Sequence, residues 1–258
     1  MKKLAERLFL FFLILFLSAA LSCCSKFFKK DRYIVATSPN NPPLVMIDEE
    51  KEIVGFEIDV IEQIAISSDM NIKIIPVLKG NLLHGLIDET YDIAISSITS
   101  STGARSFENI DINYSNPYLE IGEVFVLSED FKDYKGLKDL VNKTVGLRKA
   151  TESKQILIKE GHINIKEYTK IENTFEDMAL GKIDAICVDL PTAAQFVHLN
   201  DEYKRIFRIH PDPITVKEYV IAVKKGKNSL LNRINSGIEK MKKDGSLDML
   251  INKWFFLK

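Results

Sequence analysis

Several features that define common protein classes are scarce in this chain of 258 residues. It has 3 Cys, two of them adjacent near the N-terminus, which is too few for a disulfide framework. Gly and Pro number 12 and 8, which excludes collagen and low-complexity sequences. The 35 Lys and Arg residues are balanced by 36 Asp and Glu residues, so no basic surplus exists for binding nucleic acid. The chain is predicted to fold around an ordinary hydrophobic core and to bind no nucleic acid.

Motifs for metal binding and for catalysis are also missing. No histidine has a histidine or cysteine partner three or four residues further on, and the cysteines form no CxxC. The glycine patterns GxGxxG, GxxxxGK[ST] and GxSxG do not occur, which removes the sequence support for nucleotide binding and for a hydrolase nucleophile. We therefore predict neither a metal site nor a cofactor. Cys187, inside an apolar run, is expected to be a buried and inert thiol.

The first residues have the pattern of an export signal. Lys2, Lys3 and Arg7 precede an apolar run from Leu8 to Leu17, and this run is shorter than the ~20 apolar residues that a membrane-spanning helix needs. The run ends in Ala-Leu-Ser-Cys23, which resembles the lipobox of bacterial lipoproteins. Residues 1–22 are thus predicted to be a lipoprotein signal peptide, with lipid, including palmitate, on Cys23. Modification of the next cysteine or a plain secretory cleavage is the alternative, and residues 23–32 are expected to form a tether.

Apolar strand patterns alternate with helical patterns along the rest of the chain, which predicts an α/β fold with largely parallel sheets. Strands are expected at 33–37, 72–76, 144–147, 165–168, 184–188 and 219–223. Helices are expected at 56–66, 151–159, 174–180 and 246–254, with a further amphipathic helix from about 230 that Gly245 ends. The single tryptophan, Trp254, is expected to pack in the core.

Two segments resemble one another. The run from Asp92 to Ser97 and the run from Asp184 to Asp189 each place an aspartate before a buried strand and a polar residue five positions later. Ligands of open α/β sheets collect at the carboxyl ends of strands, so Ser97 and Asp189 are expected to face a shared crevice.

A polar run, Ser96 to Arg105, follows the first of these strands. Such a run is usually a solvated loop or a helix cap. Alternatively, its hydroxyls and backbone N–H groups accept an anion, and its arginine grips a carboxylate with two hydrogen bonds. Since Asp189 in the other half could hold an ammonium group, the second reading predicts a site for a zwitterionic amino acid.

From Tyr33 to Phe255 the chain resembles the extracellular solute-binding proteins, family 3, of polar amino-acid ABC importers. The resemblance rests on motifs in a characteristic order, which are Asn41-Pro-Pro-Leu, Gly55-Phe-Glu-Ile-Asp-Val, Tyr91 to Arg105, Tyr114-Ser-Asn-Pro-Tyr, Thr144-Val-Gly-Leu, Gly181 to Asp189, Tyr219 to Lys224, Lys243-Asp-Gly-Ser-Leu and Trp254-Phe255. It implies a two-lobed, periplasmic-binding-protein-like (type II) Venus flytrap, each lobe a mostly parallel sheet flanked by helices. Lobe 1 would comprise 33–119 plus 220–258 and lobe 2 would comprise 120–219. Two crossing hinge segments are expected near 118–123 and 216–219.

The resemblance also implies roles for single residues. Arg105 would bind the ligand α-carboxylate and Asp189 the α-ammonium group. Further contacts would come from Ser97, Thr99 or Ser100, Thr102, Thr151, Asn41 and Arg148. The one-residue-longer spacing between Ser96 and Arg105 leaves Thr99 and Ser100 as alternatives.

Three departures from the family pattern bear on specificity. Asn41 and Lys79 replace aromatic residues, and Ala-Thr151-Glu152 replaces the usual start of a helix in lobe 2. Lys79 and Arg148 would lie toward the side-chain end of the ligand, which favours a neutral or acidic amino acid such as glutamine or glutamate. Glu57 or Glu152 could neutralise these bases and reverse that preference.

The predicted function is that of a lipid-anchored, extracytoplasmic bacterial binding protein. It would act as a monomer, capture a small polar amino acid by closure of its lobes, and deliver it to the permease of an ABC importer. It is not predicted to be an enzyme. The alternatives are a sensor or adhesin that kept the fold, or a cyclohexadienyl-dehydratase-like enzyme in which Glu57 or Glu152 is the general acid or base.

Overall fold

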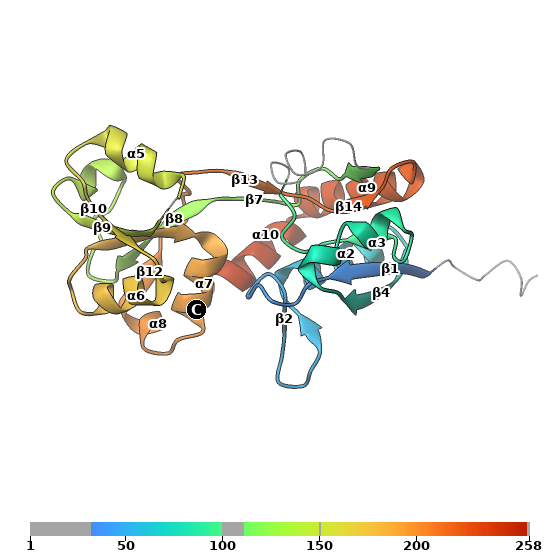
Figure 1. The fold of residues 1–258 in the computed structure, drawn as a ribbon, viewed down its shortest axis with the longest axis horizontal. Helices are drawn as coiled ribbons and strands as arrows, with labels where there is room; N and C mark the ends of the chain where they lie inside the picture. The colour runs from blue at the N-terminus through green and yellow to red at the C-terminus, as the bar shows by residue number, and fades with distance from the viewer. Residues whose placement is uncertain (1–31, 100–110, 150, 257–258) are drawn as a thin grey trace, which may run out of the picture. The chain divides into compact units, whose positions relative to one another are not determined.

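The computed structural model describes residues 32–99, 111–149 and 151–256 (Figure 1). The predicted signal peptide, Cys23, Ser100, Thr102 and Arg105 lie outside the described residues. In the described part, two five-stranded sheets form the centres of two lobes.

The first sheet has the strand order β4-β1-β5-β14-β6 and forms the centre of lobe 1. Its strands are β1 (Arg32–Thr37), β4 (Asn71–Pro76), β5 (Ile93–Ala94), β6 (Ile112–Tyr114) and β14 (Ala222–Lys224). β1 and β5 pair in parallel, whereas β14 runs antiparallel to both β5 and β6. The helices of this lobe are α2 (Phe56–Ser67), α3 (His84–Ile87), α9 (Asn228–Asp244) and α10 (Ser246–Ile251), together with the short hairpin β2 (Met46–Ile47) and β3 (Ile53–Val54) and the turn η1 (Lys79–Asn81).

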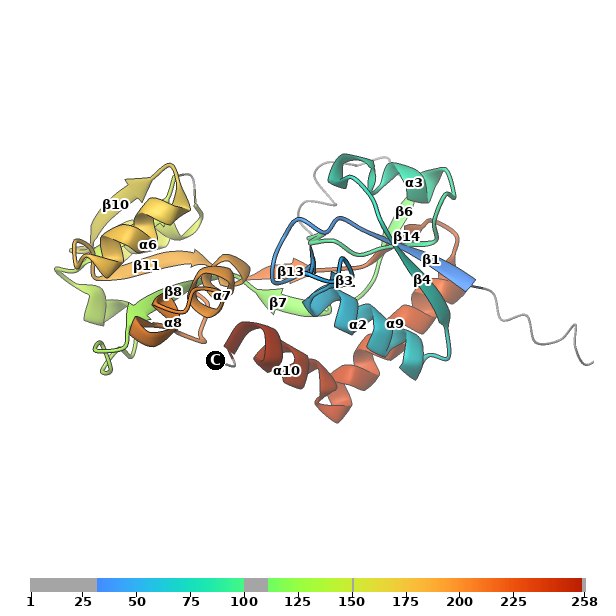
Figure 2. The same cartoon turned by 90° about the horizontal axis from the view of Figure 1, so that it is seen from below.

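Helices α2 and α9 cover one face of this sheet, as Figure 2 shows. The predicted apolar stripe of α9 is buried at Leu230, Ile234, Ile238 and Met241. The two helices pack closely because Gly237 has no side chain, and a Cβ there would lie 2.9 Å from Ile64. Gly245 ends α9 in the left-handed conformation, with φ 79°, as predicted.

The second sheet has the order β10-β9-β11-β8-β12 and forms the centre of lobe 2. Its strands are β8 (Glu123–Ser128), β9 (Thr144–Arg148), β10 (Asn164–Tyr168), β11 (Ala185–Asp189) and β12 (Phe207–Ile209). β9 pairs in parallel with β10 and β11, while β8 is antiparallel to β11 and β12. The helices are α5 (Ser153–Glu160), α6 (Ile171–Ala179), α7 (Leu190–His198) and α8 (Tyr203–Ile206), with the turn η2 (Leu137–Leu140). Both sheets therefore combine parallel pairs with strands that the crossing chain inserts in the opposite direction.

Some predicted boundaries differ from the structure by two residues or more. Helix α5 begins at Ser153 instead of Thr151, and α6 begins at Ile171 instead of Thr174. The single strand expected over 219–223 is divided into β13 (Lys217–Tyr219) and β14. The division has a physical cause, since the chain changes partners there: Val220 N donates to Ile98 O and the next N–H donates to the Ser115 hydroxyl.

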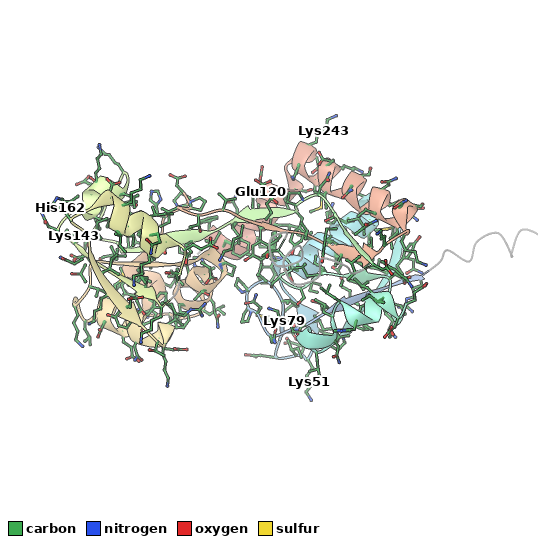
Figure 3. All side chains as sticks on the ribbon, turned by 45° about the horizontal axis from the view of Figure 1, so that its top comes forward. Lys51, Lys79, Glu120, Lys143, His162 and Lys243 are labelled. Atoms are coloured by element: carbon green, nitrogen blue, oxygen red, sulfur yellow. The ribbon has the colours of Figure 1, made fainter. Side chains whose placement is uncertain are left out.

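The two crossing segments pair with each other. Strand β7 (Leu119–Ile121) runs antiparallel to β13, with Tyr219 opposite Leu119 and Glu218 opposite Glu120. Both strands lie within the segments predicted as hinges, and Glu120 is labelled on β7 in Figure 3. The backbone just after β7 packs closely against the segment before β13, since a Cβ on Gly122 would lie 1.7 Å from the Thr215 carbonyl oxygen.

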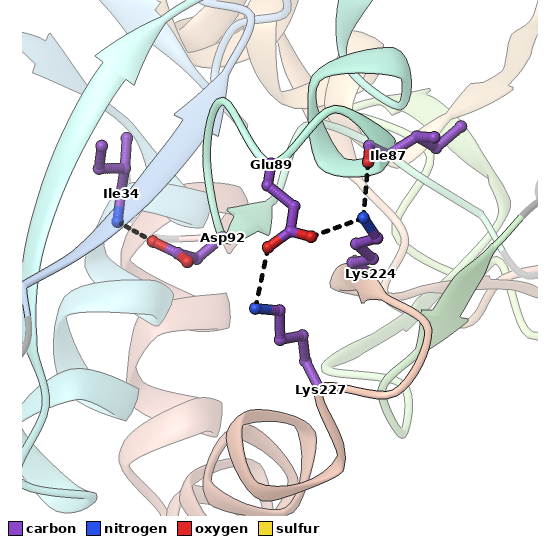
Figure 4. A network of polar contacts seen from close by, with 6 residues as sticks. All are labelled: Ile34, Ile87, Glu89, Asp92, Lys224 and Lys227. Carbon is purple, nitrogen blue, oxygen red and sulfur yellow. Dashed lines mark hydrogen bonds and ion pairs between the residues drawn. The ribbon is translucent and has the colours of Figure 1, made fainter.

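The internal sequence resemblance corresponds to equivalent positions in the two sheets. Asp92 Oδ2 accepts the N–H of Ile34 at 2.8 Å, next to the first residue pair of β1 and β5 (Figure 4). Asp184 Oδ2 accepts the N–H of Thr144 at 2.7 Å at the start of β9. In each case the aspartate N–H also donates to the carbonyl of the same partner residue. The same clamp therefore fixes β1 to the segment that leads into β5 in lobe 1 and β9 to the segment that leads into β11 in lobe 2.

The neighbouring contacts in Figure 4 hold the other end of lobe 1 together. Glu89, at the end of α3, accepts hydrogen bonds from Lys224 at 2.7 Å and Lys227 at 3.1 Å. Lys224 also donates to the carbonyl oxygen of Ile87. These exposed contacts join α3 to β14 and to the start of α9.

The C-terminal segment η3 (Asn252–Phe256) contacts elements of both lobes. Trp254 is only partly buried, and its Nε1 donates to Asp59 Oδ2 on α2 at 2.7 Å. The Phe255 ring packs against Phe56 with the ring centroids 5.1 Å apart. The Phe255 carbonyl oxygen lies 2.8 Å from His198 Nε2 at the end of α7. Trp254 thus packs against the core as expected but is only partly buried, because its indole N–H reaches the Asp59 carboxylate.

Candidate ligand-binding site

Asp189 stands where β11 ends and α7 begins. As the N-cap of α7, its Oδ1 accepts the Thr192 N–H at 3.0 Å and the Thr192 hydroxyl at 2.8 Å. Oδ2 accepts no hydrogen bond from any residue that the structure describes. The cap therefore fixes the orientation of the carboxylate and leaves one oxygen for another donor.

A pocket of about 150 Å³ adjoins this carboxylate. It brings together three residues that the sequence predicts for ligand binding, Arg148, Thr151 and Asp189. The remaining lining residues are Glu123, Glu152, Cys187, Val188 and Lys217. Lys217 was not predicted, because its position on this pocket depends on the pairing of β13 with β7, which the sequence pattern does not give.

Some polar groups of this pocket already form hydrogen bonds within the protein, and others do not. Glu123 is buried, and its Oε2 accepts the N–H of Ser153 at the start of α5 at 2.8 Å. The Ser153 hydroxyl lies 3.3 Å from the Thr151 hydroxyl. Arg148 and Lys217 have neither a hydrogen bond nor an ion pair with any described residue. The two cations Arg148 and Lys217, the Glu152 carboxylate and one oxygen of Asp189 thus remain for a ligand.

Lobe 1 places Ser97 at the corresponding end of β5. Its backbone is in the left-handed region, with φ 52°. The Ser97 N–H donates to Glu57 Oε1 at 2.6 Å, and its hydroxyl oxygen accepts the side-chain amide of Asn41 at 2.7 Å. Asn41 and Ser97, both predicted site residues, therefore lie together. The Ser97 N–H is already used by the protein, and both this N–H and the Ser97 side chain lower the pKa of Glu57 by hydrogen bonding.

Thr99 lies next to the crossing strands. It forms an isolated antiparallel bridge with Tyr219, the last residue of β13. Burial, and to a smaller extent the carboxylates of Asp189 and Glu57, raises the pKa of Tyr219. Tyr219 is therefore close enough to both Asp189, at the end of β11, and Glu57, on α2, for each carboxylate to affect its pKa. Of the two alternatives for one ligand contact, Thr99 is described and Ser100 is not.

Glu57 is the residue whose position the sequence did not reveal. It lies in the first turn of α2, is fully buried, and accepts the Tyr118 hydroxyl at 2.7 Å on the same Oε1 that accepts Ser97. Its Oε2 is buried without a hydrogen-bond partner among the described residues. Burial raises the pKa of this carboxyl to about 7, although hydrogen bonds from Tyr118 and from the backbone and side chain of Ser97, together with the charge of Lys79, oppose the rise. Lys79 itself is exposed on η1 and is labelled in Figure 3.

No helix among the described residues has the length and apolar character needed to cross a membrane. The same residues contain no cluster of three or more acidic, histidine or cysteine side chains that could hold a metal ion.

Residues 33–256 match the family model for bacterial extracellular solute-binding proteins, family 3. The ABC transporter arginine-binding protein 1 of Escherichia coli (strain K12) is 26% identical over 225 residues, which cover 84% of this chain and 88% of that protein. The ABC transporter glutamine-binding protein GlnH of Bacillus subtilis (strain 168) is 26% identical over 208 residues, covering 79% and 73%. The second substrate-binding domain of Lactococcus lactis GlnP, in its open conformation, has a TM-score of 0.74, with 24% identity and coverage of 89% and 97%.

The chain belongs to the bacterial extracellular solute-binding proteins, family 3. Its curated relatives above are amino-acid-binding proteins of ABC transporters, and its fold is the two-lobed type II arrangement that the sequence predicts.

Proposed function

We propose that this protein captures a small polar amino acid and delivers it to the permease of an ABC importer. The observation that carries the proposal is the pocket at the end of β11, where Asp189, Thr151 and Arg148 meet. A carboxylate with one oxygen fixed and one oxygen available suits an α-ammonium group, since charge-assisted hydrogen bonds are the stronger ones. Membership of the family supports the same class of ligand.

Arg105 completes the proposed site by binding the α-carboxylate with its guanidinium group. A ligand held by Asp189 in lobe 2 and by Arg105 after β5 bridges the two lobes. Its binding energy then favours the closed state, because only that state allows both contacts at once. We propose that residues 33–119 plus 220–258 move as one lobe and 120–219 as the other. The membership of β14 in the first sheet and of β8 in the second supports these boundaries.

Isothermal titration calorimetry with L-glutamine, L-glutamate and L-arginine tests the site. Asp189→Asn keeps an oxygen for the α7 cap but removes the charge that holds the ammonium group. Loss of a hydrogen bond to a charged group costs about 1.5 to 3 kcal/mol, so the dissociation constant should rise roughly 10- to 150-fold. Asp201→Asn, an exposed change in the same lobe, is the matched control and should bind as the wild type does. Equal affinity of the Asp189 and Asp201 variants would remove Asp189 from the site.

The role of Arg105 is tested in the same way. Arg105→Lys keeps the positive charge and loses the planar pair of donors, so it should already weaken binding, and Arg105→Ala should weaken it further. Arg205→Ala changes an exposed arginine in lobe 2 and serves as the control. A folded Arg105→Ala protein with the wild-type dissociation constant would contradict the assignment.

A neutral or acidic ligand is the preference we propose. Arg148 and Lys217 are cations without an ion-pair partner among the described residues, and both line the pocket beside Asp189. A cationic ligand side chain near them is repelled, by an amount that grows as the site loses water. Glu152 on the same pocket is the group that opposes this argument. Competition calorimetry decides the matter, and tighter binding of arginine than of glutamine and glutamate would overturn the preference.

We further propose that the protein is an extracytoplasmic monomer that is anchored to a membrane by lipid on Cys23. Metabolic labelling with a palmitate analogue should mark the wild type and not Cys23→Ser, while Cys24→Ser should still be labelled. Labelling of Cys23→Ser at the wild-type level would refute this site.

A binding role is favoured over the enzymatic alternative by the position of Glu57. A general acid or base must lie within hydrogen-bond reach of the substrate. The Glu57 side chain is fully buried and holds Ser97 and Tyr118. Mass spectrometry of prephenate and arogenate incubated with the protein should find both unchanged, and consumption of either would establish the enzyme.

A further inference from the structure

A single carboxylate oxygen joins three segments that are far apart in the sequence. Glu57 Oε1, in the first turn of α2, accepts the N–H of Ser97 at 2.6 Å and the hydroxyl of Tyr118 at 2.7 Å. Ser97 follows the short strand β5, at the predicted ligand site, and Tyr118 directly precedes the crossing strand β7. Because both donors meet at one carboxylate oxygen, the charge of this carboxylate affects both hydrogen bonds at once.

The surrounding contacts hold this oxygen in place from several directions. The Glu57 N–H donates to the carbonyl of Leu44 at 2.9 Å, and the next-door Phe56 packs against the Tyr118 ring with centroids 6.3 Å apart. On the far side of Ser97, Asn41 donates to the Ser97 hydroxyl oxygen. Glu57 and Tyr118 are 0% and 1% exposed, so water does not compete for these bonds.

We propose that Glu57 is a positioning residue that couples the ligand-contacting turn at Ser97 to the crossing strand β7. It does not touch the ligand. The ionised carboxylate holds the Ser97 N–H and the Tyr118 hydroxyl together, so that the turn and the strand adopt their binding arrangement as one unit. The proposal rests on the proposed amino-acid binding site, because Ser97 and Asn41 are residues of that site.

The proposal predicts that binding depends on the charge of Glu57. The titratable and charged groups near it are Tyr118 before β7, Tyr219 on β13 and Lys79 on η1. Burial raises the pKa of both tyrosines, so both stay neutral through the physiological range. Burial also raises the pKa of Glu57 to about 7, so this carboxyl is the member of the group that changes charge near neutral pH.

The test is calorimetry with L-glutamine, L-glutamate and L-arginine between about pH 6 and about pH 8. Ionised Glu57 makes charge-assisted bonds and protonated Glu57 makes weaker neutral ones, so wild-type affinity should fall by about tenfold as the pH is lowered. Glu57→Gln should bind at all pH values with the weaker, low-pH affinity. Glu62→Gln is the matched control, since it makes the same chemical change on the same helix at an exposed position.

A wild-type affinity that is constant with pH, and equal to that of Glu57→Gln, would overturn the proposal. Tyr118→Phe provides a second variant, which keeps the buried ring and removes only the bond to β7. In nuclear magnetic resonance spectra of the wild type, the backbone amides of Ser97 and Leu119 should titrate together near pH 7. In Tyr118→Phe the Ser97 amide should still titrate and the Leu119 amide should not.

The amide titrations also separate the two proposals. If none of the three amino acids binds the wild type, the proposed function fails, whereas the coupling still stands or falls on the joint titration of Ser97 and Leu119. If these two amides show different midpoints in the wild type, or if Glu57→Gln leaves both titrations unchanged, the coupling is wrong.

Discussion

Cys187 lies at the middle of β11 with no exposed surface, and burial raises the pKa of its thiol to about 12. The sequence predicted this inert role from the apolar run around the residue. Because the thiolate is the reactive form, the native protein should not react with a thiol reagent at neutral pH. A variant with Cys23→Ser and Cys24→Ser leaves Cys187 as the only thiol. It should be labelled only in denaturant, and rapid labelling of the folded form would contradict the buried position.

Glu57 should make stability depend on pH. The folded protein keeps a proton on this carboxyl up to about pH 7, whereas the unfolded chain releases it near 4.5. The folded state therefore binds more protons between these values, and the free energy of unfolding falls as the pH rises from 4.5 toward 7. The decline is at most ~3 kcal/mol for a shift of this size.

Urea unfolding of Glu57→Gln across this range should show a flatter pH profile than the wild type. Glu62→Gln should keep most of the decline, because partial burial and Asp59 raise the pKa of Glu62 by less than burial raises that of Glu57. A wild-type profile in Glu57→Gln would mean that another group titrates.

At the scale of secondary-structure elements, the two aspartate clamps should contribute independently to stability. Asp92 and Asp184 each accept a backbone N–H at the start of a different sheet and share no partner. Replacing either with alanine leaves a strand N–H without its acceptor, at a cost of about 1 to 3 kcal/mol. The double variant should lose the sum of the two effects in urea unfolding. Asp88→Ala, exposed on the segment before Asp92, should cost little.

The turn between β7 and β8 should tolerate no side chain. A Cβ at Gly122 would overlap the Thr215 carbonyl, so Gly122→Ala must push the two crossing segments apart. We expect a loss of at least about 1 to 3 kcal/mol in thermal or urea unfolding. Gly136→Ala is the control, since no atom lies within 4 Å of its Cβ position. Similar stability of both variants would show that the segments separate easily.

Elements with a strong pattern of their own could be predicted from the sequence, and elements that depend on a distant partner could not. The α9 stripe and the stop at Gly245 are local, so the pattern gave them correctly. The break between β13 and β14 arises because the chain leaves β7 and joins the first sheet, which no local pattern records. The start of α5 at Ser153 likewise depends on Glu123, thirty residues earlier.

For the whole molecule, the sequence led to the family and to the two-lobed fold, which the family model confirms. The grouping of Arg148, Thr151 and Asp189 in one pocket agrees with the residues expected there, although their contact with a ligand stays a prediction. The buried position of Glu57 and the position of Lys217 on the pocket could not be predicted from the sequence. A buried acid looks like any acid at the start of a helix, and the direction of Lys217 depends on the register of two strands.

The contacts of the C-terminal segment make the intrinsic fluorescence of Trp254 a probe of movement between the lobes. Trp254 is the only tryptophan in the chain, and its indole N–H is bonded to Asp59 while the neighbouring Phe255 carbonyl faces His198 of lobe 2. Indole emission shifts in colour and intensity when its hydrogen bond or its exposure to water changes. A movement that alters the contact with α7 therefore acts directly on the residue next to the fluorophore. The response to added ligand can be followed through the tryptophan emission without attaching a dye, and a change in this emission reports on the surroundings of Trp254.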